Sequence, residues 1–313
     1  MSEELSVLLR RLLDQGEVPA DRFDFEEAAP QRLGLVVTDG KVLLPAGVVA
    51  LDAEAISAQL SPEAAQWLRG VTVFPAVDST NSRMVKLAQS ASIDGLAWFA
   101  ELQTAGRGRR GRRWLTPFGR NIAVSLGFEL GLPTGALGGL SLAIGLAVAE
   151  FLRYEGIEAA AVKWPNDVYI DGAKVCGILM EVVAKAEHCA CIVGIGLNVD
   201  LPASARAAID QEVTDLRTHG LSMDRNGIAA ALASEVVEAV RRFGREGFLP
   251  RRSAYDRLHV CQGRDCRVVQ GNQTREGVVL GVTGEGALRM RCSGETVEFT
   301  GGEVSLRPAS KPA

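Results

Sequence analysis

A short run of arginines and glycines is the stretch of this sequence with the most evident chemistry. Residues 106–114 read GRGRRGRRW and hold five arginines and three glycines. Glycine lets the backbone fold tightly, and guanidinium groups bind phosphate through forked hydrogen bonds. This composition predicts a mobile loop that closes over a reactive acyl phosphate, with Trp114 covering an apolar portion of the ligand.

The alternative for this run is a solvated tail or a nucleic-acid-binding patch, since arginine- and glycine-rich segments are common in both. Two observations argue against it. Residues 96–102 and 121–128 on either side read as buried strands, so the run is an internal loop. The formal net charge is −4 at pH 7, whereas proteins that coat nucleic acid are usually basic. We therefore favour a ligand-binding loop.

A second cluster of polar residues lies in the sequence KWPND, residues 163–167. Its proline forces the preceding residue into an extended conformation, so Asn166 and Asp167 are expected in a turn between strands. Such residues are commonplace in turns. Lys174 follows, in an otherwise small and apolar strand over residues 173–181. Because an unpaired lysine is costly to bury, Lys174 either reaches solvent or meets an anion.

Polar residues also gather at the start of a predicted helix over residues 82–89. Ser79 and Thr80 would cap it, and a helix start with free N–H groups also makes a good polar pocket wall. Gln103, at the end of the strand before the arginine run, would face the same pocket, although an exposed loop position explains it equally well. The strand over residues 191–199 contains glycines that permit close approach of a backbone or a ligand.

The N-terminal region, residues 1–66, reads as a degenerate winged helix-turn-helix. An amphipathic helix over residues 3–13 is followed by a hairpin over residues 35–44 with Asp39-Gly40 at its turn. The interval between them is short and acidic, and two more helices, one of them a basic recognition helix, do not fit there comfortably.

The rest of the chain divides into a main domain, residues 67–260, and a C-terminal domain, residues 261–313. The apolar run over residues 136–152 is shorter than the roughly 20 residues that span a bilayer, so we expect a buried helix. A long amphipathic helix is expected over residues 224–243. After residue 263 come short strands separated by glycines, typical of a small antiparallel barrel of the SH3 kind.

Composition indicates a globular cytoplasmic protein. The chain has 313 residues and is 47% hydrophobic and 23% charged. Its acidic first residues do not resemble a secretory leader. The six cysteines include no CxxC pair, which favours reduced core cysteines over disulfides or zinc. The three histidines lack ligand spacing, so we expect no metal site. Because the longest apolar run is too short to span a bilayer, we also expect no association with membranes.

Together these motifs resemble the biotin protein ligase family, specifically the bacterial type that can double as repressor of the biotin operon. The resemblance runs from about residue 71 to residue 307. It implies an α+β fold with a central mixed-sheet catalytic domain of the biotin/lipoate ligase type. The matching motifs are DSTN (78–81), Gln103 with the run 105–114, KWPND (163–167), Lys174 with 177–179, GIGLN (194–198) and residues 301–307.

The resemblance implies an ATP-dependent ligase that makes biotinyl-5'-AMP and transfers biotin to a lysine of the biotin carboxyl carrier protein of acetyl-CoA carboxylase. Biotin, ATP and Mg²⁺ are the implied ligands. Lys174 would bridge the biotin carboxylate and the α-phosphate, Arg109 would neutralise phosphate, and Asp167 would activate the acceptor lysine or hold magnesium. The remaining implied ligand-binding residues are Ser79, Thr80, Asn81, Gln103, Gly106, Arg107, Gly108, Arg110, Arg112, Trp114, Asn121, Gly177, Asn198 and Arg307.

Three other functions stay open at this stage. The chain could be a bifunctional ligase that also represses biotin synthesis genes, or mainly a ligand-responsive DNA-binding regulator, but its short and acidic N-terminal region argues against operator binding. It could also be a biotin or adenylate sensor without catalysis. Family members tend to dimerise through a sheet edge of the catalytic domain, and the sequence alone does not decide whether this chain does so.

Overall fold

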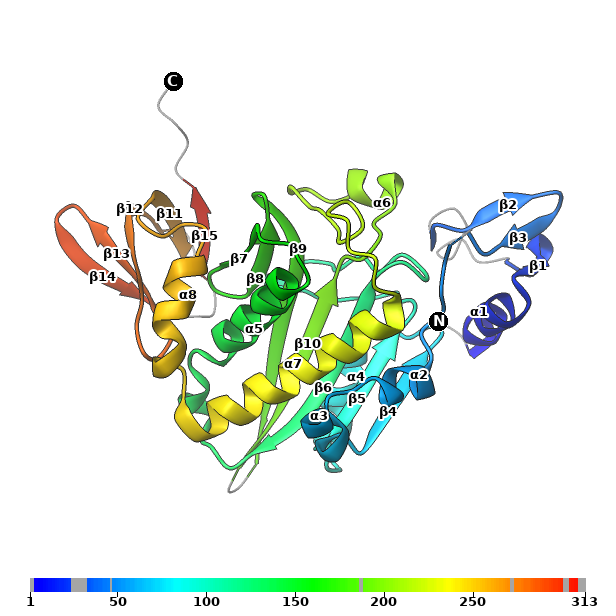
Figure 1. Cartoon of the computed structure of the whole chain (residues 1–313), viewed down its shortest axis with the longest axis horizontal. Helices are drawn as coiled ribbons and strands as arrows, with labels where there is room; N and C mark the ends of the chain where they lie inside the picture. Colours follow the sequence, from blue (N-terminus) through cyan, green and yellow to red (C-terminus); the bar gives the residue numbers. More distant parts are fainter. Residues whose placement is uncertain are drawn as a thin grey trace.

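The computed structural model describes residues 3–23, 33–45, 47–185, 188–270, 273–300 and 304–308. Three sheets follow one another along the chain (Figure 1). The first has three strands, the second and largest has seven, and the third has five. The fold is therefore α+β with a central mixed sheet, as expected.

The N-terminal part has one α-helix within its described residues, α1 (Glu3–Gln15), which packs beside a small antiparallel sheet in the order β1-β3-β2. Its strands are β1 (Glu17–Pro19), β2 (Val36–Thr38) and β3 (Lys41–Leu43). Asp39 and Gly40 both have positive φ, at 47° and 70°, as a two-residue hairpin turn requires. The predicted hairpin is confirmed, and residues 24–32 of the acidic interval lie outside the described residues.

The seven-stranded sheet has the order β4-β5-β6-β10-β9-β8-β7, with β4 and β5 parallel and the other pairs antiparallel. Its strands are β4 (Gly70–Phe74), β5 (Leu96–Ala100), β6 (Ile122–Leu130), β7 (Ala160–Lys163), β8 (Asp167–Ile170), β9 (Ala173–Ala184) and β10 (Cys189–Leu197). The strand β5 is shorter than the predicted 96–102, and β10 begins and ends two residues before the predicted strand 191–199.

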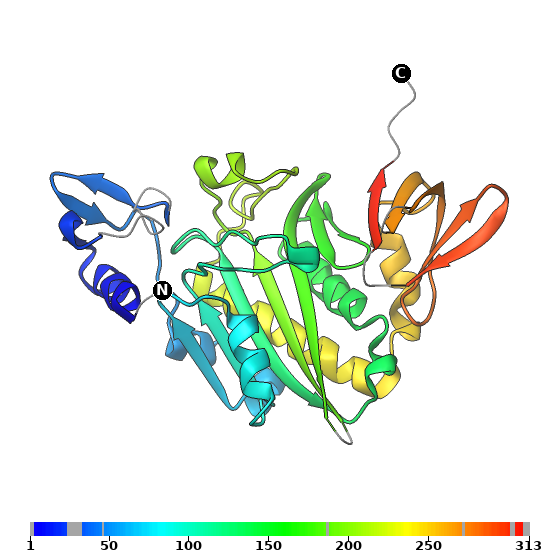
Figure 2. The ribbon, with the colours of Figure 1, turned by 180° about the vertical axis from the view of Figure 1, so that it is seen from behind.

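The central strand β10 shows how the sheet separates its two faces. Cys191, Val193 and Ile195 belong to the main hydrophobic core, whereas Ala190 and Ile192 belong to a smaller cluster around helix α4 (Thr80–Ala88). Alternate residues of a strand point to opposite faces. Gly194 and Gly196 therefore lie on the α4 face, which Figure 2 presents toward the viewer.

The opposite face of the sheet is covered mainly by the helices α5 (Leu140–Tyr154) and α7 (Arg225–Glu246), which pack on each other (Figure 1). Asp224 caps α7 by accepting from the backbone N–H of Gly227, at the start of the helix predicted over residues 224–243. Among the described residues the stretch Thr134–Tyr154 is long and apolar enough to cross a membrane, and 67% of its most apolar window is buried inside the fold. This burial fits the predicted core helix.

Short helices complete the main domain and its ends. The helices α2 (Ala53–Ala58) and α3 (Pro62–Trp67) pack on α7, and their buried Ile56 and Ala64 belong to the main core. The remaining helical segments are α6 (Ala203–Ala207), α8 (Arg252–Leu258), η1 (Ala20–Arg22), η4 (Arg109–Gly111), η5 (Thr134–Leu137) and η6 (Leu249–Arg251).

The C-terminal sheet is antiparallel in the order β14-β13-β12-β11-β15, with a bulge between Val279 and Gly281. It is consistent with the predicted SH3-like domain. Its strands are β11 (Asp265–Gln270), β12 (Gln273–Val282), β13 (Leu288–Cys292), β14 (Glu295–Phe299) and β15 (Val304–Pro308).

Candidate active site

Glycines on two neighbouring strands form the floor of a site on the α4 face of the main sheet. Gly196 of β10 pairs directly with Gly177 of β9. A Cβ at Gly196 would lie 2.1 Å from Cε2 of Trp114, and a Cβ at Gly177 would lie 3.2 Å from both the Trp114 ring and Nζ of Lys174. The missing side chains therefore leave the space in which Trp114 lies flat against the sheet.

One wall of the site is a polar cluster at the start of α4. Ser79 caps the helix, its hydroxyl accepting from the backbone N–H of Ser82. Thr80 donates its backbone N–H to Oε1 of Gln103 at 2.9 Å, and its hydroxyl lies 2.7 Å from that of Ser125. These side chains hold one another in fixed positions, so they form a prearranged set of donors and acceptors for a polar ligand head.

Asn81 extends this wall across the sheet. Its Oδ1 lies 2.5 Å from the Ser125 hydroxyl, and its amide nitrogen donates to the carbonyl of Leu179 at 3.2 Å and to Oε2 of Glu181 at 2.9 Å. A Cβ at Gly194 would lie 2.3 Å from Oδ1 of Asn81. Only glycine at that position leaves room for this amide.

The arginine- and glycine-rich loop covers the same face of the sheet (Figure 2). Arg110 and Gly111 adopt positive φ, at 59° and 74°, and the loop closes on itself where the Trp114 N–H donates to the carbonyl of Gly106 at 2.9 Å. A Cβ at Gly106 would lie 2.5 Å from the Trp114 carbonyl oxygen, so this turn requires glycine. The loop is thus folded compactly, as the sequence predicted.

Two arginines tie the loop to the neighbouring strands. Arg107 forms an ion pair with Glu181 at 2.5 Å between Nη2 and Oε2, and Arg109 donates to Oδ1 of Asn166 at 3.0 Å. Burial, partly offset by the nearby Asp167 carboxylate, lowers the pKa of the Arg109 guanidinium below its ordinary value. Arg109 is therefore partly withdrawn from water, where an anionic ligand would bind it more strongly.

Lys174 and Asp167 form an ion pair at the end of the glycine floor. The distance from Nζ of Lys174 to Oδ1 of Asp167 is 2.9 Å, and the two side chains are 13% and 20% exposed. The Lys174 ammonium also lies 5.6 Å from the centre of the Trp114 ring. A cation in this position can meet an anion lying over the floor, which is the second of the two outcomes predicted for this lysine.

Comparison with known proteins decides the family. A model of the biotin/lipoate A/B protein ligase family matches residues 73–198, and a model of the biotin protein ligase C-terminal domain matches residues 263–307. The chain is 37% identical over 270 residues to the bifunctional ligase/repressor BirA of Escherichia coli, covering 86% of this chain and 82% of that protein. This chain belongs to the biotin/lipoate A/B protein ligase family.

Further similarities point to the biotin protein ligases within this family. The chain is 34% identical over 263 residues to the biotin–[acetyl-CoA-carboxylase] ligase of Mycobacterium tuberculosis, covering 81% of this chain and 95% of that one. It is also similar to the solved structure of the biotin protein ligase from Aquifex aeolicus in complex with biotin and ATP. That structure has a TM-score of 0.65 and 28% identity, and the match covers 77% of this chain and all of that one.

Two residues that the ligase resemblance assigned to ligand binding, Asn121 and Asn198, are bonded to protein groups, and their ligand contacts stay predictions. Asn121 is fully buried and Asn198 nearly so, and they bond to each other at 3.0 Å. Asn121 accepts from the N–H of Val199, and Asn198 donates to the carbonyl of Thr214. The structure therefore places both in a buried network that joins strands to the segment beside Lys174.

The outer part of the loop faces solvent. Arg110 and Arg112 are exposed, and the N–H of Gly108 donates to the carbonyl of Arg112 at 2.7 Å. Arg307 lies on β15, opposite Arg267, and its side chain is outside the described part of the structure. Ligand contacts by Arg110, Arg112 and Arg307 therefore stay predictions.

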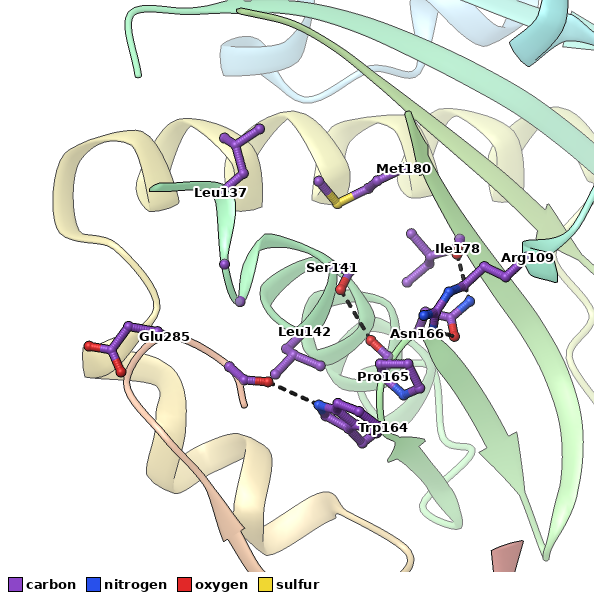
Figure 3. Close-up of a pocket in the computed structure, with 13 residues that line it drawn as sticks. Arg109, Leu137, Ser141, Leu142, Trp164, Pro165, Asn166, Ile178, Met180 and Glu285 are labelled. Atoms are coloured by element: carbon purple, nitrogen blue, oxygen red, sulfur yellow. Dashed lines mark hydrogen bonds between the residues drawn. The ribbon is translucent and has the colours of Figure 1, made fainter. Parts of the chain in front are cut away.

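A pocket of about 230 Å³ opens beside the loop, at the start of α5 and against the C-terminal sheet (Figure 3). Arg109 and Asn166 lie at one side of it, and Glu285 lies at the other. The Trp164 indole N–H donates to the carbonyl of Gly286 at 2.9 Å, which joins the main domain to the C-terminal sheet here. Arg109 thus belongs both to the lining of this pocket and to the loop that covers the glycine floor.

Two residues of the site were missed from the sequence. Ser125 is directly opposite Gly194 in the β6–β10 pairing and so faces the site. A serine inside the apolar run IAVSLGF was a usable signal, because strand alternation sets its face. Glu181 comes at the end of an apolar strand, where an acidic residue usually only marks the return to solvent, so its sequence context carried no comparable signal.

Proposed function

We propose that this chain activates biotin with ATP to give biotinyl-5'-AMP and diphosphate, and then transfers the biotinyl group to a lysine of a biotin carboxyl carrier protein. The observation that carries this proposal is the arrangement of Lys174 at the end of a glycine floor, beneath a loop of guanidinium groups. That arrangement suits a mixed anhydride of a carboxylic acid and a phosphate, because the bound species carries negative charge at one end.

In the first half-reaction the biotin carboxylate oxygen attacks the α-phosphorus, and the bond to the leaving diphosphate breaks. Two anions must meet, so charge neutralisation and positioning are the main needs. We assign Lys174 to bridge the two anions and Arg109 to neutralise phosphate. Each charge-assisted hydrogen bond contributes about 1.5–3 kcal/mol, so two or three suffice to order the loop.

The uncharged end of biotin would lie at the start of α4. Ser79, Thr80 and Gln103 would bind its polar ureido head, which has both donors and acceptors. Their mutual hydrogen bonds support this assignment, because the groups are already oriented before a ligand arrives. Trp114 would cover the apolar part of the ligand.

In the second half-reaction the acceptor lysine amine attacks the acyl carbon, and the bond to AMP breaks. The amine must lose its proton, and Asp167 is the carboxylate nearest to Lys174 that could take it. When Lys174 turns toward the bound adenylate, Asp167 is left to accept this proton. Such a general base typically accelerates a reaction about 10²- to 10⁴-fold.

Magnesium would enter with ATP. Within the described residues no three His, Cys, Asp or Glu side chains gather to hold a metal ion. Magnesium in nucleotide sites is commonly held by one or two carboxylates together with phosphates and water. Asp167 is the carboxylate in this site that fits such a contact, and the phosphate oxygens would supply the others.

We further propose the predicted division into three domains with its first boundary moved, a cytoplasmic location and a homodimer. Free, buried cysteines among the described residues suit a reducing compartment. The packing of α2 and α3 on α7 favours moving the first boundary to before Leu51. Sedimentation with biotin and ATP present measures the oligomeric state.

The decisive experiment is incubation with biotin, MgATP and a biotin carboxyl carrier domain, followed by intact-mass measurement of the carrier. We expect one biotinyl group on the carrier and release of AMP and diphosphate. Binding of biotin without transfer would identify a sensor and contradict the proposal. A carrier whose acceptor lysine is replaced by arginine is the matched control and should gain no mass.

A second activity, repression of biotin synthesis genes, is suggested by relatives named bifunctional ligase/repressor and by the helix beside a three-stranded sheet at the N-terminus. The short acidic interval after α1 argues against it, since phosphate contacts need basic residues. A gel shift with operator DNA at a stated salt concentration, with biotin and ATP present, distinguishes the two.

A further inference from the structure

We propose that Glu181 is a positioning residue that holds the arginine- and glycine-rich loop, residues 106–114, against the sheet both before and after the adenylate forms. The proposal rests on the ligase activity proposed above. It concerns a residue outside the assigned set of ligand contacts, and it names Arg107 as the group through which Glu181 acts.

One carboxylate oxygen joins the loop to the pocket wall. Oε2 of Glu181 accepts from Nη2 of Arg107 at 2.5 Å and from Nδ2 of Asn81 at 2.9 Å. The ion pair is partly exposed, with Arg107 at 44% and Glu181 at 26%. Because Glu181 is on β9 and Arg107 is in the loop, this oxygen directly links a rigid strand to a segment that must open for ligands to enter.

The wall side of this link is firmly fixed. Asn81 has its carbonyl oxygen at the Ser125 hydroxyl and its amide nitrogen on Leu179 and Glu181, and it packs over the bare Cα of Gly194. Only 4% of Asn81 is exposed. Glu181 is therefore held from one side by a buried, fully hydrogen-bonded amide, and it can set the position of Arg107 on the other.

The second tether of the loop is Arg109. Its guanidinium group donates to the neutral amide oxygen of Asn166 at 3.0 Å, with the Asp167 carboxylate nearby. A phosphate oxygen carries charge and competes well with an amide for a guanidinium group. We therefore expect Arg109 to exchange Asn166 for the ligand, whereas Arg107 stays paired with the charged Glu181. The loop then keeps one end attached while the other end closes on the adenylate.

A double-mutant cycle tests this role. The protein is loaded with biotin and MgATP, freed of excess ligand, and the rate at which biotinyl-AMP leaves is followed without acceptor. In Glu181→Gln the amide oxygen still accepts from Asn81 but the charge facing Arg107 is lost. We expect the release rate to rise about three- to fivefold, the range that a partly exposed ion pair supplies. Arg107→Ala should give a similar rise.

The double variant separates positioning through Arg107 from a general structural effect. If Glu181 acts through Arg107, the double variant releases adenylate no faster than either single variant. Multiplied effects, or an unchanged release rate in Glu181→Gln, would overturn the proposal. If the unaltered protein forms no biotinyl-AMP, the proposed function fails instead, so the two failures are distinguishable.

Glu129→Gln is the matched control. Glu129, at the far end of β6, pairs with Lys185 at 3.2 Å, and the two side chains are 22% and 24% exposed. The substitution removes an ion pair of similar burial from the same sheet without touching the loop. It should leave adenylate release unchanged. A rise equal to that of Glu181→Gln would show that the effect is not specific to the loop and would also overturn the proposal.

Discussion

Nζ of Lys174 lies 2.9 Å from Oδ1 of Asp167, and β8 and β9 hold the two side chains together at the end of the glycine floor. Each side chain neutralises the charge of the other, and both are largely buried. An arriving carboxylate and phosphate offer Lys174 a stronger partner, so the pair is expected to separate when ligands bind. The two residues then have different tasks, and variants of each test them separately.

Lys174→Ala removes the cation assigned to the two meeting anions. We expect the rate of biotin-dependent exchange between ATP and labelled pyrophosphate to fall about 10²- to 10³-fold, the usual loss when one group that stabilises developing charge is removed. Lys185→Ala, which removes a lysine of comparable burial from the Glu129 pair, should exchange at the unaltered rate. Exchange near the unaltered rate in Lys174→Ala would show that the bridging role is wrong.

Asp167→Asn keeps the shape of the side chain and removes its ability to take a proton. With biotinyl-AMP already formed, we expect single-turnover transfer to the carrier lysine to fall at least about 10²-fold. Adenylate formation, measured by pyrophosphate exchange, should fall much less. An equal loss in both half-reactions would instead mean that Asp167 orients Lys174 or holds magnesium.

Arg109→Gly removes the loop contact with Asn166 and the guanidinium group assigned to phosphate. The loop should close less firmly, so biotinyl-AMP should escape and react with exposed lysines of unrelated proteins. Biotin labelling of serum albumin, detected on a blot, measures this escape. Arg109→Lys keeps the charge but loses the forked geometry, and it should label less than Arg109→Gly. If labelling does not rise, the loop does not act as a lid that retains biotinyl-AMP.

Patterns that depend on neighbouring residues could be predicted from the sequence. The turn at Asp39-Gly40, the cap at Asp224 and the alternation of β10 follow from backbone preferences and strand geometry, and the structure has all three. The loop of residues 106–114 was located because its composition is extreme. Lys174 was identified because a charged residue in an apolar strand requires a partner.

Relationships between distant segments could not be predicted in this way. Nothing local to Asn121 or Asn198 indicates that they bond to each other. In the same way, Glu181 is joined to Arg107 and Asn81 only by the register of the sheet and the path of the loop. Such contacts depend on which strands become neighbours, and hydrophobic periodicity does not specify that.

Gly196→Ala tests whether the floor needs its bare surface. A Cβ there would lie 2.1 Å from Cε2 of Trp114, so the ring must move away from the sheet. We expect biotin affinity, measured by calorimetry, to weaken at least about tenfold, because the cover over the ligand is displaced. Gly244→Ala, in α7 with open space around the new Cβ, is the control and should bind normally. Unchanged affinity in Gly196→Ala would place biotin elsewhere.

The junction with the C-terminal domain should be weakened by acid through His259. This residue is 4% exposed, and its Nε2 accepts from the backbone N–H of Trp164 at 3.1 Å while its ring stacks on Tyr255. Burial, assisted by the nearby Lys163 ammonium, lowers the pKa of His259 to about 4 from an ordinary value of 6.5. Between about pH 4 and pH 6.5, His259 is therefore protonated in the unfolded chain and neutral in the folded chain.

The sign of the effect follows from this proton. The contribution of neutral His259 to stability is complete above about pH 6.5 and is lost as pH falls toward 4, at up to about 1.4 kcal/mol per pH unit. His259→Gln, whose amide oxygen can still accept from Trp164, should remove this dependence. Urea unfolding between pH 7.5 and pH 5 measures it, with His188→Gln, a more exposed histidine, as the control. If the free energy of unfolding changes with pH in the same way for the unaltered protein and for His259→Gln, then His259 takes up its proton without opening the junction.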